Sequence, residues 1–176
     1  MERPVSSAPF LVVFDFDWSL INENSDEYIV HALDPSGAIW EEAKKKLAGG
    51  AQWTTLMDWV AGELHAAGHT VADMQEALGR VPVLPSVLAA LALAREHGAE
   101  VRILSDANTM YIRWILGAIG LSDAFAATET NPAGVGADGR LRIRPHQPPE
   151  SPHRCPLCPT NLCKVHVHAH VSTVRS

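Results

Sequence analysis

The sequence predicts an α/β fold with a parallel sheet that is interrupted by a helical insertion. Two short apolar runs, residues 10–13 and 101–104, are typical of buried strands, and each runs into a polar loop. Apolar residues recur with helical spacing between the two runs and again after the second. The order strand, helical insert, helix, strand, helix favours a parallel sheet with right-handed crossovers. A chain of 176 residues can bury one such core.

The insertion, residues 24–82, is expected to form a small all-helical cap. Its first helix begins near residue 25, where Ser25 can serve as the N-cap and Asp26 suits the positive end of the helix dipole. Glycines and prolines separate the later segments of the insertion. These further helices are expected at residues 38–47, 53–64 and 71–78.

The core is expected to comprise residues 1–23 and 83–164, with residues 165–176 as a tail of aberrant sequence. After the insertion we expect a helix that begins at Pro85 and ends in a left-handed cap at Gly98. A strand at 101–104 and a helix ending at Gly120 should follow. Beyond them we expect a short strand near 125–128 and a hairpin with its turn at 134–139 and its return strand at 141–143. Prolines are frequent at residues 145–159, where no regular structure is expected.

Composition narrows the functional classes. A formal net charge of −6 and a pI near 5.8 argue against a nucleic-acid surface. No stretch approaches the roughly 20 apolar residues that cross a bilayer, and no secretory signal is evident at the N-terminus. The three cysteines cluster too closely for a disulfide framework and fit a reducing compartment. We therefore expect a cytoplasmic protein without a membrane partner, and the sequence indicates no protein-partner surface.

The acids that follow the first strand are the main functional signal. Asp15 and Asp17 share one side-chain parity, and in a parallel sheet they lie at the carboxyl end where ligands bind. Two adjacent carboxylates repel each other, and a Mg²⁺ ion that also meets substrate phosphate oxygens would compensate them. A carboxylate beside such a phosphate can attack phosphorus. An ordinary acidic turn is the alternative interpretation.

Several ordered motifs carry a resemblance to a known family. Residues 14–19 resemble the D-x-D-x-[TS] motif of the haloacid-dehalogenase-like phosphatases, and residues 103–106 resemble their second motif. Further matching stretches are residues 22–26, 104–109, 130–133, 139–143 and 158–164. Together they resemble the phosphoethanolamine/phosphocholine phosphatase family, which includes pyridoxal-phosphate phosphatases and plant thiamine-monophosphate and pyrophosphate phosphatases. The implied fold is a three-layer, Rossmann-like core with a helical cap, incomplete at the C-terminus.

The resemblance implies a catalytic set. Asp15 would be the nucleophile and a Mg²⁺ ligand. Asp17 would act as acid and then as base, while its backbone carbonyl meets the metal. Ser105 would hydrogen-bond a phosphoryl oxygen, and Lys164 would balance negative charge.

The same resemblance implies a substrate-binding role for Asp26 and Asp106. Two acids beside a phosphate ester suit a substrate whose remainder is cationic, and Trp18 could add a cation–π contact. The alternatives are structural: Asp26 as a first-turn acid and Asp106 as a helix cap.

The resemblance is expected to end near Lys164. No Asp or Glu follows it, so the family's G-D-G-x-x-D-like metal loop has no match in the sequence. We expect weak Mg²⁺ binding and weak or absent turnover, because the metal site then lacks one acid. A fragment that binds organophosphates without hydrolysing them is one alternative.

A zinc-binding module is another alternative. Cys155, Cys158 and Cys163, followed by His166, offer four zinc ligands, and His168 and His170 lie nearby in the sequence. The family resemblance instead treats the cysteine-rich segment as part of the fold.

Overall fold

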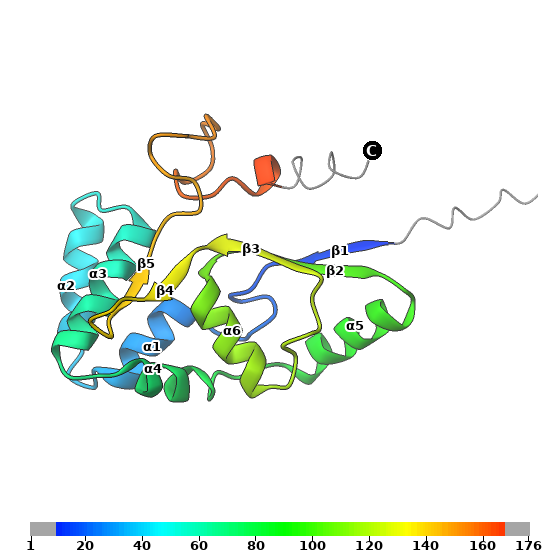
Figure 1. The fold of residues 1–176 in the computed structure, drawn as a ribbon, viewed down its shortest axis with the longest axis horizontal. Helices are drawn as coiled ribbons and strands as arrows, with labels where there is room; N and C mark the ends of the chain where they lie inside the picture. Colours follow the sequence, from blue (N-terminus) through cyan, green and yellow to red (C-terminus); the bar gives the residue numbers. More distant parts are fainter. Residues whose placement is uncertain (1–9, 168–176) are drawn as a thin grey trace, which may run out of the picture.

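A parallel three-stranded sheet forms the centre of the computed structural model, which describes residues 10–167 (Figure 1). Its strands are β1 (Leu11–Phe14), β2 (Glu100–Asn108) and β3 (Ala127–Asn131), in the order β1-β2-β3. Within the described residues β1 pairs only with β2, from Leu11 opposite Glu100 to Phe14 opposite Ile103. The predicted α/β class is therefore confirmed.

The helices between β1 and the rest of the core lie close to their predicted positions. They are α1 (Ser25–Leu33), α2 (Ala38–Ala48), α3 (Trp53–Ala66) and α4 (Val71–Leu78). The predicted cap of α1 is wrong by one residue. Asn24, not Ser25, is the N-cap, and its side-chain oxygen accepts hydrogen bonds from the backbone N–H groups of Asp26 and Glu27.

Two helices cover the same face of the sheet, namely α5 (Pro85–Glu96) and α6 (Thr109–Ala118), which lie below it in Figure 1. Val101 packs with Leu91 of α5, and Ile103 shares a buried cluster with Ile112 of α6. Val101 and Ile103 project to one side of β2, whereas the alternate residue Leu104 packs with Leu162 and Val167. The last described segment thus contacts the other face.

The predicted hairpin is present. Strands β4 (Ala133–Val135) and β5 (Leu141–Ile143) pair antiparallel, and β5 lies against α3. Asp58 of α3 fixes this arrangement, because its carboxylate accepts hydrogen bonds from the backbone N–H of Ile143 (2.8 Å) and the guanidinium of Arg140 (2.8 Å).

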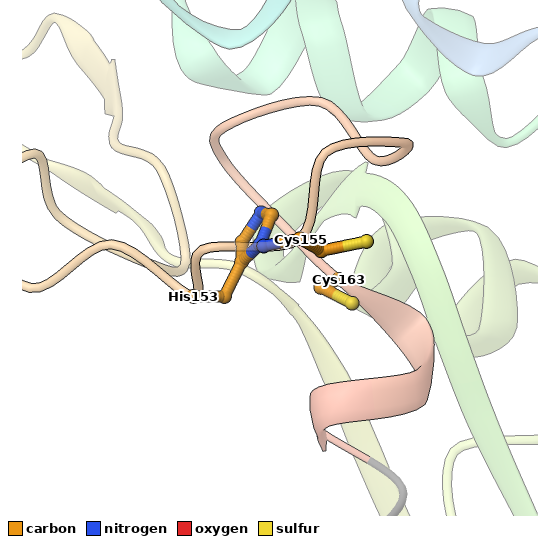
Figure 2. A group of neighbouring side chains, drawn as sticks. All are labelled: His153, Cys155 and Cys163. Carbon is orange, nitrogen blue, oxygen red and sulfur yellow. The ribbon is translucent and has the colours of Figure 1, made fainter.

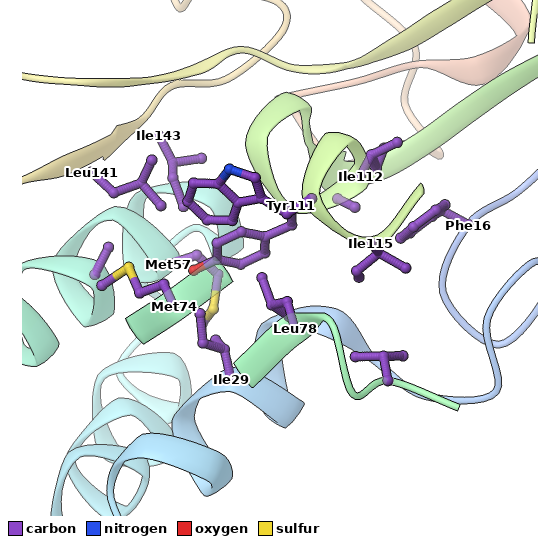
Figure 3. Close-up of a cluster of buried hydrophobic side chains, with 14 of the residues drawn as sticks. Phe16, Ile29, Met57, Met74, Leu78, Tyr111, Ile112, Ile115, Leu141 and Ile143 are labelled. Carbon is purple, nitrogen blue, oxygen red and sulfur yellow. The ribbon is translucent and has the colours of Figure 1, made fainter. Parts of the chain in front are cut away.

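One hydrophobic cluster joins the inserted helices to the remainder of the molecule (Figure 3). It draws residues from the loop after β1, from α1, α3, α4 and α6, and from β5. Its members include Phe16, Ile29, Met57, Met74, Leu78, Tyr111, Ile112, Ile115, Leu141 and Ile143. Phe16 of the acid-bearing loop is packed in the same cluster as Ile112 and Ile115 of α6, so the core fixes the loop against that helix. The division into a cap at 24–82 and a core remains a prediction.

Two strand boundaries differ from prediction. β2 continues past residue 104 to Asn108, and β3 occupies 127–131 instead of 125–128. The pairing of β2 with β3 is irregular between Leu104 and Asn108. There the Asn131 side chain donates to the backbone carbonyls of Asp106 (2.6 Å) and Ala107 (3.0 Å). These side-chain hydrogen bonds replace part of the backbone hydrogen bonding between β2 and β3, so the polar residues 105–108 can continue the strand.

Candidate active site

Asp15 is the first residue beyond β1, and its carboxylate contacts Lys164, the lysine to which the family resemblance gave a charge-balancing role. The Lys164 Nζ lies 2.6 Å from Asp15 Oδ2, although 149 positions separate the two residues. The other oxygen, Oδ1, accepts a hydrogen bond from the backbone N–H of Phe16 (2.8 Å). Both side chains are about 40% exposed (38% for Lys164 and 43% for Asp15), so the pair contributes little to stability and remains open to a ligand.

Asp17 is held on the inner side of the same loop. Its Oδ1 accepts a hydrogen bond from the backbone N–H of Ser25 at the start of α1 (2.9 Å). Burial raises the pKa of Asp17 to about 6, against the opposing effect of the Ser25 hydrogen bond. The nearby charge of Asp15 adds to the increase and that of Lys164 reduces it. Asp15, Asp17 and Lys164 therefore share one electrostatic neighbourhood.

The loop itself is rigidly folded. The Phe16 carbonyl accepts backbone hydrogen bonds from Ser19, Leu20 and Ile21, and Phe16 is fully buried. Trp18 occupies the left-handed region with φ 56° and is 66% exposed. Such a conformation is strained for a tryptophan and persists because the surrounding hydrogen bonds fix the turn.

Asp26 lies in the first turn of α1 and is buried, with 4% of its surface exposed. The indole N–H of Trp53 on α3 donates to its Oδ2 (2.7 Å). Burial raises the pKa of Asp26 to about 7, and the negative charges of Asp17 and Asp106 add to the effect. Asp26 is thus a buried acid that is coupled to the other acids of the site, in addition to its place in the first turn of α1.

Ser105 and Asp106 belong to β2, the neighbour of β1. Ser105 is buried, and its Oγ accepts a hydrogen bond from the backbone N–H of Ala107 (3.1 Å). Asp106 does not cap α6, because Asn108 is the N-cap of that helix. Instead, Asp106 Oδ1 accepts a hydrogen bond from the side-chain amide of Asn161 (2.9 Å).

Two asparagines complete the polar arrangement and had no assigned role in the sequence interpretation. Asn131 at the end of β3 bonds the carbonyls of β2, accepts from the backbone N–H of His146 (3.0 Å), and accepts from Asn161 Nδ2 (3.3 Å). Asn161 lies three residues before Lys164. Both residues lie in stretches that resemble the family, residues 130–133 and 158–164, and this resemblance is the sequence feature that could have identified them. They connect the end of the sheet to the segment that delivers the lysine.

The predicted residues therefore gather at the carboxyl end of the sheet. Asp15 contacts Lys164 directly, Asp17 is charge-coupled to both, and Asp26 is charge-coupled to Asp17 and Asp106. Ser105 is placed there by its strand and contacts none of them through a described hydrogen bond. Contacts or charge coupling thus link the four acids, and Lys164 contacts one of them, Asp15. Mg²⁺ prefers carboxylate and carbonyl oxygens as ligands, and the Asp15 carboxylate and the Asp17 carbonyl are the groups here that would hold it.

The fold is that of the haloacid-dehalogenase-like α/β proteins. Similar solved structures include a HAD family hydrolase from Salmonella enterica serovar Typhi (TM-score 0.59, 17% identity, 78% of this chain and 46% of that one). A phosphoserine phosphohydrolase-like protein from Francisella tularensis matches over 95% of this chain and 74% of its own (TM-score 0.59, 14% identity). A phospho-aspartyl intermediate analogue of phosphoserine phosphatase gives a TM-score of 0.53 at 16% identity, covering 77% of this chain and 63% of that one.

The chain belongs to the family described as Putative Phosphatase, which it matches over residues 10–176. That match extends beyond residue 164, where the resemblance was expected to end. Curated relatives include inorganic pyrophosphatase 2 of Arabidopsis thaliana (36% identity, 88% of this chain, 54% of the relative). Others are a thiamine phosphate phosphatase-like protein of the same plant (34%, 93% and 65%) and human pyridoxal phosphate phosphatase PHOSPHO2 (32%, 88% and 62%). The chain spans between half and two thirds of these relatives' lengths. The predicted family is therefore confirmed.

None of the helices within residues 10–167 combines the length and the apolar character needed to cross a membrane.

Proposed function

We propose that the protein is a Mg²⁺-dependent phosphatase that hydrolyses small phosphate monoesters or pyrophosphate. The observation that carries this proposal is the contact of Asp15 with Lys164 beside a second acid, Asp17, whose pKa is raised. The family match and the relatives' names, which specify pyrophosphate, thiamine phosphate and pyridoxal phosphate, support it. When bound, Mg²⁺ would neutralise phosphate charge beside the Asp15 carboxylate and the Asp17 carbonyl.

In the first step a carboxylate oxygen of Asp15 attacks phosphorus and the bond from phosphorus to the leaving oxygen breaks. The Asp17 carboxyl group gives its proton to that oxygen. Burial favours the protonated form of Asp17, which suits the role of an acid. Lys164 remains beside the attacking carboxylate and compensates the charge of the incoming phosphate.

In the second step water hydrolyses the aspartyl-phosphate. Asp17, now a carboxylate, accepts a proton from the water, whose oxygen attacks phosphorus, and the bond to Asp15 breaks. Inorganic phosphate leaves and Asp17 is protonated again. The single group serves both steps because the two proton transfers occur in sequence. Ser105 is proposed to hold a phosphoryl oxygen from the neighbouring strand.

The acidic surroundings favour a substrate with a cationic remainder. The buried Asp26 is charge-coupled to Asp17 and to Asp106. A cation at this position would stabilise the ionised form of Asp26. Phosphocholine, phosphoethanolamine and thiamine monophosphate have such a cation, whereas pyrophosphate does not.

We also expect slow turnover from the 176-residue chain. Its proposed metal ligands are one carboxylate and one carbonyl, which are few protein ligands for Mg²⁺. A cytoplasmic location likewise stays a prediction.

The test is phosphate release from the four candidate substrates and pyridoxal phosphate, with and without Mg²⁺. We expect Mg²⁺-dependent release that Asp15→Asn abolishes and that Glu63→Gln, an exposed substitution on α3, leaves unchanged. Calorimetric binding of a phosphate ester without any release, even in single-turnover reactions, would instead identify a binding fragment and overturn the proposed enzyme.

A further inference from the structure

A second group of ligand-type side chains lies outside the proposed active site. His153, Cys155 and Cys163 each offer one ligand atom, and these atoms all lie within 4.8 Å of one another (Figure 2). All three come from the irregular segment that follows β5. The proposed phosphate chemistry uses none of them, so their convergence needs another explanation.

The chemical nature of the group matches zinc. Zinc prefers thiolate and imidazole ligands, and in a tetrahedral site these ligand atoms lie about 3.5–3.8 Å apart. The spacing observed here is therefore within about 1 Å of a closed site. Two thiols and one imidazole without hard oxygen ligands would bind Mg²⁺ poorly, which separates this group chemically from the acids around Asp15.

His153 is already oriented as a metal ligand. Its Nε2 lies 2.9 Å from the Pro159 carbonyl, which can only accept a hydrogen bond, so Nε2 has the proton. Nδ1 is then unprotonated, and it accepts from the backbone N–H of Cys155 (3.0 Å). Zinc-bound histidines commonly donate the second ring N–H to a backbone carbonyl in this way. Only the hydrogen bond from the Cys155 N–H must be replaced by the metal.

The third cysteine is available as a fourth ligand. Cys158 is not a member of the compact group, but its thiol interacts with the thiols of Cys155 and Cys163. Cys155 and Cys158 have the C-x2-C spacing of structural zinc sites. His166, which the sequence had offered as the histidine ligand, is not a member of the group in the described residues, and His153 takes its place. His168 and His170 lie outside the described residues.

We propose that His153, Cys155 and Cys163, with Cys158 as the fourth ligand, bind one structural Zn²⁺ ion. Four protein ligands leave no open position for catalysis. Each cysteine releases its proton when it binds the metal. The free energy of metal binding then contributes to folding and stabilises a segment that has little regular structure of its own. Cys163 directly precedes Lys164, so the metal would hold the segment that brings the lysine to Asp15. The proposal rests on the loop residues alone and not on the proposed function.

The test uses the full chain purified without a histidine tag. We expect about one zinc per chain after dialysis, measured by elemental analysis. Cobalt added to the zinc-free protein should give the absorption bands of a tetrahedral site and an intense thiolate-to-cobalt charge-transfer band. These measurements on the unaltered chain need no substitution, so they do not depend on the folding of a variant.

Substitutions then assign the ligands. Cys155→Ser, Cys163→Ser and His153→Ala should each lower zinc affinity by ~10-fold or more, and Cys158→Ser should weaken the charge-transfer band. The matched control is the double variant His168→Ala/His170→Ala, which should keep its zinc. Circular dichroism checks that each variant is folded.

Three results would overturn the proposal. The first is an unaltered chain that shows no bound zinc and no tetrahedral cobalt spectrum. The second is zinc that disappears with His168 and His170 but persists without the cysteines. The third is a disulfide, detected by mass spectrometry in protein kept under reducing conditions. An unchanged cobalt spectrum in Cys158→Ser would overturn the assignment of the fourth ligand.

Discussion

The loop after β1 and the segment after β5 supply the two halves of the candidate site, but they are held in different ways. The first loop folds on itself through three hydrogen bonds to the Phe16 carbonyl and packs buried side chains into the main core. The segment at residues 146–164 depends on side-chain contacts, chiefly those of Asn131, Asn161 and Lys164. The main core therefore fixes the acids, whereas the lysine is positioned by polar contacts and by the small separate cluster of Leu104, Leu162 and Val167.

The largest effect should follow from removing the cation itself. Lys164→Met should lower the rate of phosphate release by ~10²–10³-fold, because Lys164 is the cationic side chain that contacts the attacking carboxylate of Asp15. Single-turnover kinetics measure this rate. Lys45→Met, which removes an exposed lysine paired with Glu42 on α2, is the matched control and should change little. A Lys164→Met rate within a few fold of the unaltered chain would show that the lysine has no part in the chemistry.

The buried acid Asp26 should make the free energy of unfolding depend on pH. The pKa of Asp26 is raised from 3.8 to about 7, so between these pH values the folded chain retains a proton that the unfolded chain has released. The free energy of unfolding should therefore fall as pH rises from about 4 to 7, by on the order of 4 kcal/mol if Asp26 acts alone. The charges of Asp17 and Asp106, which face Asp26, contribute to this cost.

Asp26→Asn removes this charge and can still accept the hydrogen bond from Trp53. Urea unfolding without added Mg²⁺ should show the variant to be more stable than the unaltered chain at pH 8 and nearly equal at pH 4. Glu63→Gln should leave the pH slope as it is. Asp17, whose pKa is also raised, should leave a shallower slope in Asp26→Asn, and a slope as steep as that of the unaltered chain would assign the pH dependence to other groups.

The sequence anticipated the two halves unequally. Strand parity alone places Asp15 and Asp17 together, whereas Asp26, nine positions further on, was assigned to the site only through the family resemblance. Asn161 and Asp106 are 55 positions apart, and no periodicity marks their contact. Lys164 was placed only through the family resemblance. The extension of β2 was missed because Ser105 and Asp106 are typical of a loop, and the asparagine bonds that support the strand are non-local.

Loss of the hydrogen bond between Asn161 and Asp106 should have a moderate effect on stability and on the rate of phosphate release. Asn161→Ala leaves Asp106 without its side-chain donor, which should cost about 1–2 kcal/mol in the free energy of unfolding. A rate loss of ~10-fold should accompany it, because Lys164 lies three residues further on. Chemical denaturation and single-turnover kinetics measure the two quantities. Gln75→Ala, which removes an exposed amide on α4, serves as control. A destabilised variant with an unchanged rate would separate this contact from the lysine.

The smallest effect concerns the exposed Trp18. Trp18→Leu keeps an apolar side chain at the same strained position but removes the aromatic ring. Loss of a cation–π contact worth about 1 kcal/mol should raise KM for phosphocholine by ~5-fold and leave KM for pyrophosphate unchanged. Equal changes for both substrates would indicate that Trp18 shapes the loop and does not contact the cation.

The most direct test of the account is to locate the phosphoryl group on the protein. Rapid acid quenching of a reaction with labelled substrate and Mg²⁺, followed by peptide mapping, should place the label on Asp15. Asp17→Asn should retain the label longer, because the water then lacks its base, and Asp15→Asn should have none. Phosphate release that proceeds normally in Asp15→Asn, or a label on any other residue, would contradict the account.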